Sequence, residues 1–271
     1  MRRRTLLRGA SGLGLAGLAG CSSPAPPLPP PTVTGSKPNR PVNVEYVRSE
    51  ARGRNVTLVV MRPAGEVDST LPVCVALHGR GSDARMFVQL GVPDLLTQLA
   101  GEGRPPFAMV GVDGGNDYWV ARTHHDDPQR MLTEELPGWL AERDLEPAPF
   151  AAFGLSMGGY GALNYARTTP HPVVAALSPA LFLDWPDAES RDAFAGEEAW
   201  ASTDPFQHLD ALGDTKLGVW CGTDDPFVDA ARKLADAASP EVAAFDPGDH
   251  DAPYWLRTVP RAVRFLADHA G

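Results

Sequence analysis

Short apolar runs alternate with helical patterns along most of the chain, and this alternation constrains the fold more than any other feature of the sequence. The runs typical of buried strands cover residues 72–79, 106–115, 149–156, 173–180, 216–225 and 241–250. Helical patterns lie near residues 83–101, 129–143, 157–169, 228–238 and 258–269. Strands that alternate with helices in this way predict an α/β fold, in which a mostly parallel central sheet has helices on both faces.

Two further strands are expected before this region. Residues 42–50 and 54–64 alternate apolar and polar side chains and are separated by a short turn, which predicts a hairpin. Residues 181–212 carry several aromatic side chains and no strand pattern, so we expect a small cap insertion over the strand ends there. Residues 42–271 together have the length of one α/β domain.

Polar side chains stand where the predicted parallel strands end. They are His78, Asp113, Ser156, Asp224–Asp225 and His250. In open α/β sheets, ligands bind outside the carboxyl ends of the strands. The sequence therefore predicts one functional site at this edge of the sheet.

A serine stands between a predicted strand and a predicted helix. Residues 154–158 read Gly-Leu-Ser-Met-Gly, and a G-x-S-x-G motif in this context is typical of a nucleophile elbow. The motif alone is weak, because such a serine can also lie in an ordinary tight turn. The strand before and the helix after it favour Ser156 as the nucleophile.

A serine hydroxyl needs a base to remove its proton. In enzymes with a nucleophile elbow, an acid and then a histidine follow the serine along the chain. His171 lies between two prolines at the wrong end of the sheet, His208 precedes the candidate acids, and His269 lies in the C-terminal tail. His250 directly follows the last predicted strand, so it is the expected base.

The acid and the oxyanion donors are assigned from their places at strand ends. Asp225 follows Gly222 by three residues in a turn, and Asp224 is the alternative acid. We expect this carboxylate to orient the imidazole rather than take up a proton. The backbone N–H groups of Met157 and Arg80 are the expected oxyanion hole. The place of His78 beside the Arg80 loop indicates a structural role.

At this point the chain resembles a known family. The motifs LHGRGSD, VDGGNDYW, GLSMGGYGAL, CGTDDPF and GDHDAPYW, in this order over residues 70–265, are similar to the esterase family of esterase D (S-formylglutathione hydrolase), feruloyl and acetylxylan esterases and secreted mycolyltransferases. The resemblance implies an α/β-hydrolase fold, no cofactor, and a triad of Ser156, Asp225 and His250. Many members carry a tryptophan two residues after the histidine, where this chain has Ala252.

Two alternatives to a serine esterase remain open. One is an acyltransferase that acts on glycolipid esters of the cell envelope. The other is a catalytically silent lipoprotein that binds cell-wall material through the cleft. The expected partner of the site is therefore a small-molecule or glycolipid ester.

Further polar and aromatic residues are candidates for substrate binding. They are Asn116, Tyr118, Trp119 and Trp255, while Trp185 and Trp200 are candidate cap aromatics. Packing under a loop is an equally good interpretation of Trp119. His124 and His125 with two aspartates could ligate a metal, but adjacent residues rarely converge on one ion, so no metal site is expected.

Residues 1–21 are typical of an export signal. Residues 3–8 resemble a twin-arginine motif, and residues 18–21 resemble a lipobox whose Cys21 would be lipidated; an ordinary secretory signal is the alternative. The eight prolines of residues 22–41 predict a semi-rigid tether. We therefore expect an exported protein anchored by lipid to the outer face of the cell membrane.

Charge and cysteine content bound the remaining possibilities. The formal net charge of −10 argues against nucleic-acid binding and against electrostatic docking on anionic lipid. Cys74 and Cys221 lie in apolar strand patterns and are expected to be two buried thiols, although the sequence does not decide whether they pair.

Overall fold

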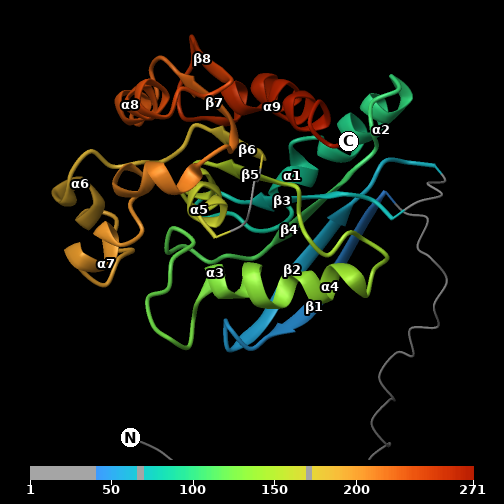
Figure 1. The fold of residues 1–271 in the computed structure, drawn as a ribbon, viewed down its shortest axis with the longest axis horizontal. Helices are drawn as coiled ribbons and strands as arrows, with labels where there is room; N and C mark the ends of the chain where they lie inside the picture. The colour runs from blue at the N-terminus through green and yellow to red at the C-terminus, as the bar shows by residue number, and fades with distance from the viewer. Residues whose placement is uncertain (1–40, 66–69, 169–172) are drawn as a thin grey trace, which may run out of the picture. The chain divides into compact units, whose positions relative to one another are not determined.

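The computed structural model describes residues 41–65, 70–168 and 173–271, which build one eight-stranded sheet flanked by helices (Figure 1). The strands are β1 (Val42–Ser49), β2 (Arg54–Met61), β3 (Val73–Leu77), β4 (Ala108–Val112), β5 (Ala151–Leu155), β6 (Val173–Leu177), β7 (Lys216–Gly222) and β8 (Val242–Asp246). Their order across the sheet is β1-β2-β4-β3-β5-β6-β7-β8. The pairs β1–β2 and β2–β4 are antiparallel, and all other pairs are parallel. The mostly parallel α/β sheet and its N-terminal hairpin are therefore confirmed.

Helices cover both faces of this sheet. They are α1 (Met86–Gln89), α2 (Val92–Gly101), α3 (Pro128–Arg130), α4 (Leu136–Ala141), α5 (Met157–Ala166), α6 (Trp185–Glu189), α7 (Glu197–Ala201), α8 (Val228–Ala238) and α9 (Ala252–Ala267), with a π-helical turn η1 (Met131–Glu135) and a 3₁₀ segment η2 (Pro205–Leu212). Buried side chains of α1, α2 and α9 pack in one core cluster, and those of η1, α4, α5 and α8 pack in another. The two clusters lie on opposite faces of the sheet.

The period of two in the strands explains this division of the core. In β3, Val73, Val75 and Leu77 face one cluster, while Cys74 and Ala76 face the other. Because Cys221 of β7 lies in the cluster opposite to that of Cys74, the two thiols are separated by the sheet. Both are free and buried, as expected.

The structure corrects two helix boundaries. The last helix starts at Ala252, six residues before the predicted start, because the Asp251 side chain accepts a hydrogen bond from the Tyr254 N–H and a proline occupies the first turn. The pattern expected as one helix over 83–101 is broken at Gly91, whose φ of +77° belongs to the left-handed region.

The segment predicted as a cap, residues 181–212, contains α6, α7 and η2 and no strand. Its aromatic side chains are largely packed inward: Phe182, Phe194 and Trp200 belong to the same core cluster as α5. Trp185 and Trp200 contact one another, with ring centroids 6.0 Å apart. Neither tryptophan lines the cleft described below.

Several of the sequence predictions fall on residues outside the described ranges. These are the export signal with Cys21, nearly all of the proline-rich tether, and His171. Within the described part of the chain, no helix combines the length and the hydropathy that a membrane span requires.

Candidate active site

Ser156 occupies the sharp turn between β5 and α5. Its φ of +56° and ψ of −119° are strained for a residue with a side chain. The flanking glycines permit this turn, because a Cβ atom at Gly154 would overlap the Gly158 carbonyl and a Cβ at Gly158 would overlap the Leu77 carbonyl. The helix therefore starts directly behind the serine, where its first N–H groups have no intrahelical acceptor.

This close packing gives a prediction for stability. Gly158→Ala is expected to lower the free energy of unfolding by about 1–3 kcal/mol, because the new methyl group must displace β3 or α5. The matched control is Gly138→Ala in α4, where a Cβ meets nothing within 4 Å and alanine should instead stabilise the helix by about 0.5–1 kcal/mol. Urea unfolding of the two variants measures both changes. Equal effects of the two substitutions would contradict the packing argument.

Three side chains from three strand ends form a hydrogen-bonded relay. The Ser156 hydroxyl lies 2.8 Å from His250 Nε2, and His250 Nδ1 lies 2.8 Å from Asp225 Oδ2. The residues follow β5, β8 and β7, which are all parallel strands and so end at the same edge of the sheet. In this arrangement the Nδ1–H of His250 donates to the carboxylate, and the free Nε2 can accept the serine proton.

The carboxylate in this relay is Asp225 rather than Asp224. The Asp225 side chain is fully buried, and its Oδ1 accepts a hydrogen bond from the Phe227 N–H at 2.9 Å. Burial raises the pKa of Asp225, but the hydrogen bonds from His250, Phe227 and Ser178 outweigh burial and lower the pKa below its usual value. Asp224 is exposed, and its N–H bonds the Gly248 carbonyl on the neighbouring loop.

Ser178 is a residue of this site that the sequence did not reveal. It ends β6, is completely buried, and has a φ of +45°. Its hydroxyl accepts a hydrogen bond from Trp255 Nε1 at 3.3 Å and also stabilises the Asp225 carboxylate. Trp255 in turn meets the His250 ring edge to face, at a centroid distance of 5.3 Å. Ser178 and Trp255 therefore help to hold the relay in place.

The loop expected to supply an oxyanion donor lies against the serine. A Cβ atom at Gly79 would stand 3.4 Å from the Ser156 Cβ, and the turn is closed by the Ser82 N–H, which donates to the Gly79 carbonyl. Arg80 is within this turn, and Met157 is the first residue of α5. Both backbone segments thus lie beside Ser156.

Residues 113–116, which follow β4, hold this loop at three points. The Gly114 N–H donates to His78 Nε2 at 2.9 Å, the Gly81 N–H donates to Asn116 Oδ1 at 2.7 Å, and the Ala84 N–H donates to Asp113 Oδ1 at 2.9 Å. His78 is buried and donates from Nδ1 to the Gly79 carbonyl, so the loop is fixed through both ring nitrogens. This places His78 in a structural position, as expected.

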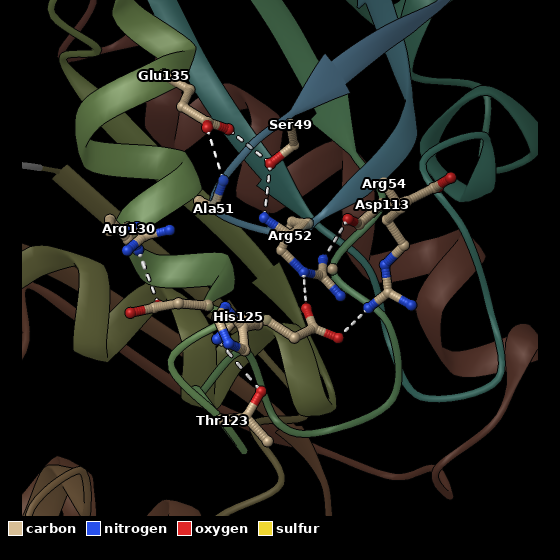
Figure 2. Close-up of polar contacts among 12 residues, drawn as sticks. Ser49, Ala51, Arg52, Arg54, Asp113, Thr123, His125, Arg130 and Glu135 are labelled. Carbon is tan, nitrogen blue, oxygen red and sulfur yellow. Dashed lines mark hydrogen bonds and ion pairs between the residues drawn. The ribbon is translucent and has the colours of Figure 1, made fainter.

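Arg52 ties residues 113–116 to the rest of the fold (Figure 2). Its guanidinium is buried, donates to the Asp113 carbonyl at 2.8 Å, and pairs with Asp126. The Glu135 carboxylate, at the end of η1, accepts hydrogen bonds from the Ser49 hydroxyl and the Ala51 N–H of the same hairpin. No motif in the sequence indicates that an arginine in a hairpin turn supports a loop beside the serine.

The tautomer of His78 leads to a prediction for pH dependence. Burial lowers the pKa of His78, although its bond to the Gly79 carbonyl and the nearby Asp113 and Asp83 oppose this effect. The folded state therefore favours the neutral ring, and the unfolded state takes up more protons once the pH falls below about 6.5. The free energy of unfolding should decrease as the pH falls from 7 to 5.

The variant His78→Gln tests this origin of acid sensitivity. Its free energy of unfolding should change less between pH 7 and pH 5 than that of the wild type, because glutamine does not titrate there. Urea unfolding at both pH values measures the two slopes. If the wild type and the variant lose stability equally, His78 is not the group responsible.

A cleft of about 530 Å³ opens at the relay. Ser156, His250, Tyr118 and Trp255 line it, as the sequence led us to expect for these residues. The remaining wall includes residues that no motif indicated, among them Met86, Leu90, Arg191, Phe227 and Leu256. They come from α1, from the segment after α6, and from the starts of α8 and α9.

Two of the residues predicted to bind substrate are not in the cleft wall. Trp119 is fully buried, and a Cβ atom at Gly114 or Gly161 would overlap its indole ring. Its Nε1 donates to the His78 carbonyl at 3.1 Å, so it packs beneath the loop and the prediction of substrate contact is wrong. Asn116 is exposed outside the wall and uses its side chain to hold Gly81.

The two histidines considered for metal binding are not part of a ligand cluster. The rings of His124 and His125 lie against each other, while the neighbouring Asp126 pairs with Arg52 and Arg54. Among the residues with described positions, no group of three or more His, Cys, Asp or Glu side chains could hold a metal ion.

Known proteins share sequence similarity with this chain. A family model described as "Putative esterase" matches residues 49–266. The MPT51/MPB51 antigen of Mycobacterium tuberculosis is 29% identical over 183 residues, which cover 58% of this chain and 59% of the relative. The diacylglycerol acyltransferase/mycolyltransferase Ag85B of Mycolicibacterium smegmatis is 34% identical over 121 residues, covering 36% of this chain and 37% of the relative. The chain thus spans less than two thirds of the length of either curated relative.

A solved structure shows the same fold. A ferulic acid esterase superposes with a TM-score of 0.72 at 19% sequence identity, covering 85% of this chain and 98% of that chain. The resemblance inferred from the motifs is confirmed by the family match, and the sheet with its flanking helices is that of the α/β-hydrolases. Because the matched residues make up most of its length, the chain belongs to this esterase family.

Proposed function

We propose that the protein hydrolyses carboxylic esters through an acyl-enzyme on Ser156, with His250 as the base and Asp225 as the residue that orients it. The observation that carries the proposal is the relay from the Ser156 hydroxyl to His250 and Asp225, with both hydrogen bonds at 2.8 Å. Membership of the esterase family supports the same chemistry.

The proposed reaction has two similar halves. Ser156 Oγ attacks the ester carbonyl carbon while His250 Nε2 takes the hydroxyl proton, and the N–H groups of Met157 and Arg80 stabilise the oxyanion. The bond to the alcohol then breaks as His250 returns the proton to the leaving oxygen, which leaves the acyl group on Ser156. Water attacks this ester in the same way and releases the carboxylic acid and the free serine.

Hydrolysis of 4-nitrophenyl acetate and butanoate tests the proposal. The wild-type protein should release 4-nitrophenolate well above the uncatalysed rate, and Ser156→Ala should not. Ser202→Ala, which removes an exposed hydroxyl that only contacts the Ala199 carbonyl, is the matched control and should retain activity. A wild-type protein that turns over neither ester would indicate the catalytically silent alternative.

Transfer of the acyl group to an alcohol is the second candidate. The similarity to a relative named as an acyltransferase supports it, although that similarity covers only about a third of this chain. In this case an acceptor hydroxyl replaces water in the second half of the reaction. Adding trehalose or another glycan to the assay should then yield an acylated sugar, whereas a hydrolase should yield the free acid alone.

We further propose that the protein is exported and anchored by a lipid on Cys21 to the outer face of the cell membrane. Support comes from the sequence, in which a twin-arginine-like motif precedes a lipobox-like motif and a proline-rich stretch. The negative net charge makes attachment through anionic lipid headgroups unfavourable. The variant Cys21→Ala should leave the membrane fraction on cell fractionation, and its retention there would contradict the anchor.

A further inference from the structure

Two arginines that have no acidic partner among the described residues line the cleft beside Ser156. They are Arg80, which lies in the loop after β3, and Arg191, which follows α6. The Arg80 guanidinium donates to the Arg191 carbonyl at 2.9 Å, so the two residues are neighbours. The chain as a whole is acidic, with a formal net charge of −10, whereas these two cleft residues are positively charged.

The surroundings of Arg191 hold its side chain without neutralising it. The guanidinium carbon lies 5.2 Å from the centroid of the Phe227 ring and 5.8 Å from that of Phe182. Its Nε is buried and has no hydrogen-bond partner. A buried donor without an acceptor is costly, so the protein itself leaves this guanidinium incompletely satisfied.

Nearby carboxylates are already engaged elsewhere. Asp192, the next residue along the chain, pairs with Arg122, and Asp117 also pairs with Arg122. Within the described ranges of the chain, neither Arg80 nor Arg191 has a carboxylate oxygen within 4.0 Å, although most of the arginines there form such pairs. The positive charge of the cleft is therefore not compensated by the protein.

Tyr118 lines the same cleft as the two arginines. Burial raises the pKa of Tyr118, while the positive charges of Arg191 and Arg80 act against burial and lower it. Tyr118 itself has a φ of +54° and lines the same wall. Apolar side chains also line the cleft, among them Met86, Leu90 and Leu256.

We infer that the ester substrate of this site carries an anionic group, a carboxylate or a phosphate, which the guanidinium groups of Arg191 and Arg80 bind while Ser156 attacks the ester carbonyl. The apolar wall would take the hydrocarbon part of such a substrate. This inference rests on the proposed esterase function and adds the substrate class to it. We assign the specificity for the anionic group to Arg191. Arg80 is not varied, because its backbone N–H also stabilises the oxyanion in the proposed reaction.

Matched pairs of esters that differ only in charge test the inference. The acyl side is probed with 4-nitrophenyl hydrogen adipate against methyl 4-nitrophenyl adipate. The alcohol side is probed with 3-(4-acetoxyphenyl)propanoate against its methyl ester. The ratio of kcat/KM for the anionic ester to that for the neutral ester is measured for each pair at low ionic strength.

The wild type should favour the anionic member of at least one pair by about 10-fold or more, and added salt should reduce this ratio. Arg191→Gln should abolish the preference, and Arg191→Lys should keep part of it. The matched control is Arg232→Gln, which removes an exposed arginine that stacks on Phe245 outside the cleft and should keep the wild-type ratio. The inference is wrong if neither pair shows a preference or if the preference survives in Arg191→Gln.

Calorimetric binding separates a failure of this inference from a failure of the esterase proposal. The Ser156→Ala protein should bind intact 4-nitrophenyl hydrogen adipate or the propanoate probe more tightly than the corresponding neutral ester, and the added substitution Arg191→Gln should weaken this binding about 10-fold or more. Absence of turnover by the wild-type protein, together with this binding pattern in Ser156→Ala, would count against the esterase alone. Hydrolysis of the neutral esters with equal binding of both members would count against the anion site alone.

Discussion

His250→Ala is expected to lower kcat for a short ester by about 10⁴- to 10⁶-fold, the range found when one member of such a triad is removed. Without the imidazole, the Ser156 hydroxyl has no acceptor for its proton, because Nε2 of His250 is the group 2.8 Å from Oγ. The fall should appear in kcat rather than in KM, since the rest of the cleft wall is unaltered. Steady-state kinetics with 4-nitrophenyl butanoate measures it.

The matched control is another histidine from the same half of the chain. His269 lies just after α9, and its ring hydrogen-bonds to the Phe265 carbonyl and the Glu241 carboxylate. His269 does not line the cleft. His269→Ala should keep kcat within a few-fold of the wild type. If the two variants lose activity equally, or if His250→Ala remains active, His250 is not the base.

Asp225→Asn is expected to lower kcat by about 10⁴-fold while the fold is retained. One carboxylate oxygen accepts the Phe227 N–H and the other accepts from His250. The asparagine oxygen can keep the bond to Phe227, which turns the amide NH₂ toward His250 Nδ1. His250 Nδ1 must then accept a hydrogen bond from this amide, so the proton of the imidazole moves to Nε2. As a result, Nε2 can no longer accept the proton of Ser156.

Asp224→Asn is the natural comparison, because it makes the same chemical change one residue away. Asp224 is exposed and contributes only its backbone N–H to the Gly248 carbonyl, so this variant should lose little activity. Measurement of kcat for both variants, with near-ultraviolet circular dichroism as a check on folding, separates the two acids. A larger loss in Asp224→Asn would reverse the assignment.

Much of the fold and the relay could be predicted because the signals are local. Each buried parallel strand is a short apolar run, and residues that end such strands must meet at one edge of the sheet. The carboxyl ends of β5, β7 and β8 therefore place Ser156, Asp225 and His250 together although up to 94 positions separate them. The glycines around Ser156 likewise indicate a sharp turn between a strand and a helix, which few other residue types could form.

Other parts of the site depend on tertiary contacts that leave no local pattern. Tyr118 and Trp119 are adjacent and both have positive φ, yet Tyr118 lines the cleft and Trp119 is buried against Gly114 and Gly161. Only the path of the backbone decides between them. Arg191 and Arg52 look like ordinary charged residues in the sequence, and their importance comes from what surrounds them after folding.

The sequence pattern places the start of the last helix too late for a different reason. Asp251 and Pro253 are recognised signals for a helix N-terminus, but they lie within the final histidine motif and precede the helical pattern near residues 258–269. Because α9 begins at Ala252, Trp255 and Leu256 lie in its first turns and line the cleft. Ala252 lines the cleft as well.

Labelling with a fluorophosphonate tests the central claim most directly, because the probe reacts covalently only with a serine that a neighbouring base activates. Mass spectrometry of the labelled protein should show one phosphonyl group per chain, located on the peptide that contains Ser156. Ser156→Ala should remain unlabelled, and His250→Ala should label much more slowly. A wild-type protein that resists the probe, or a label that is equally abundant in Ser156→Ala, would contradict the proposed active site.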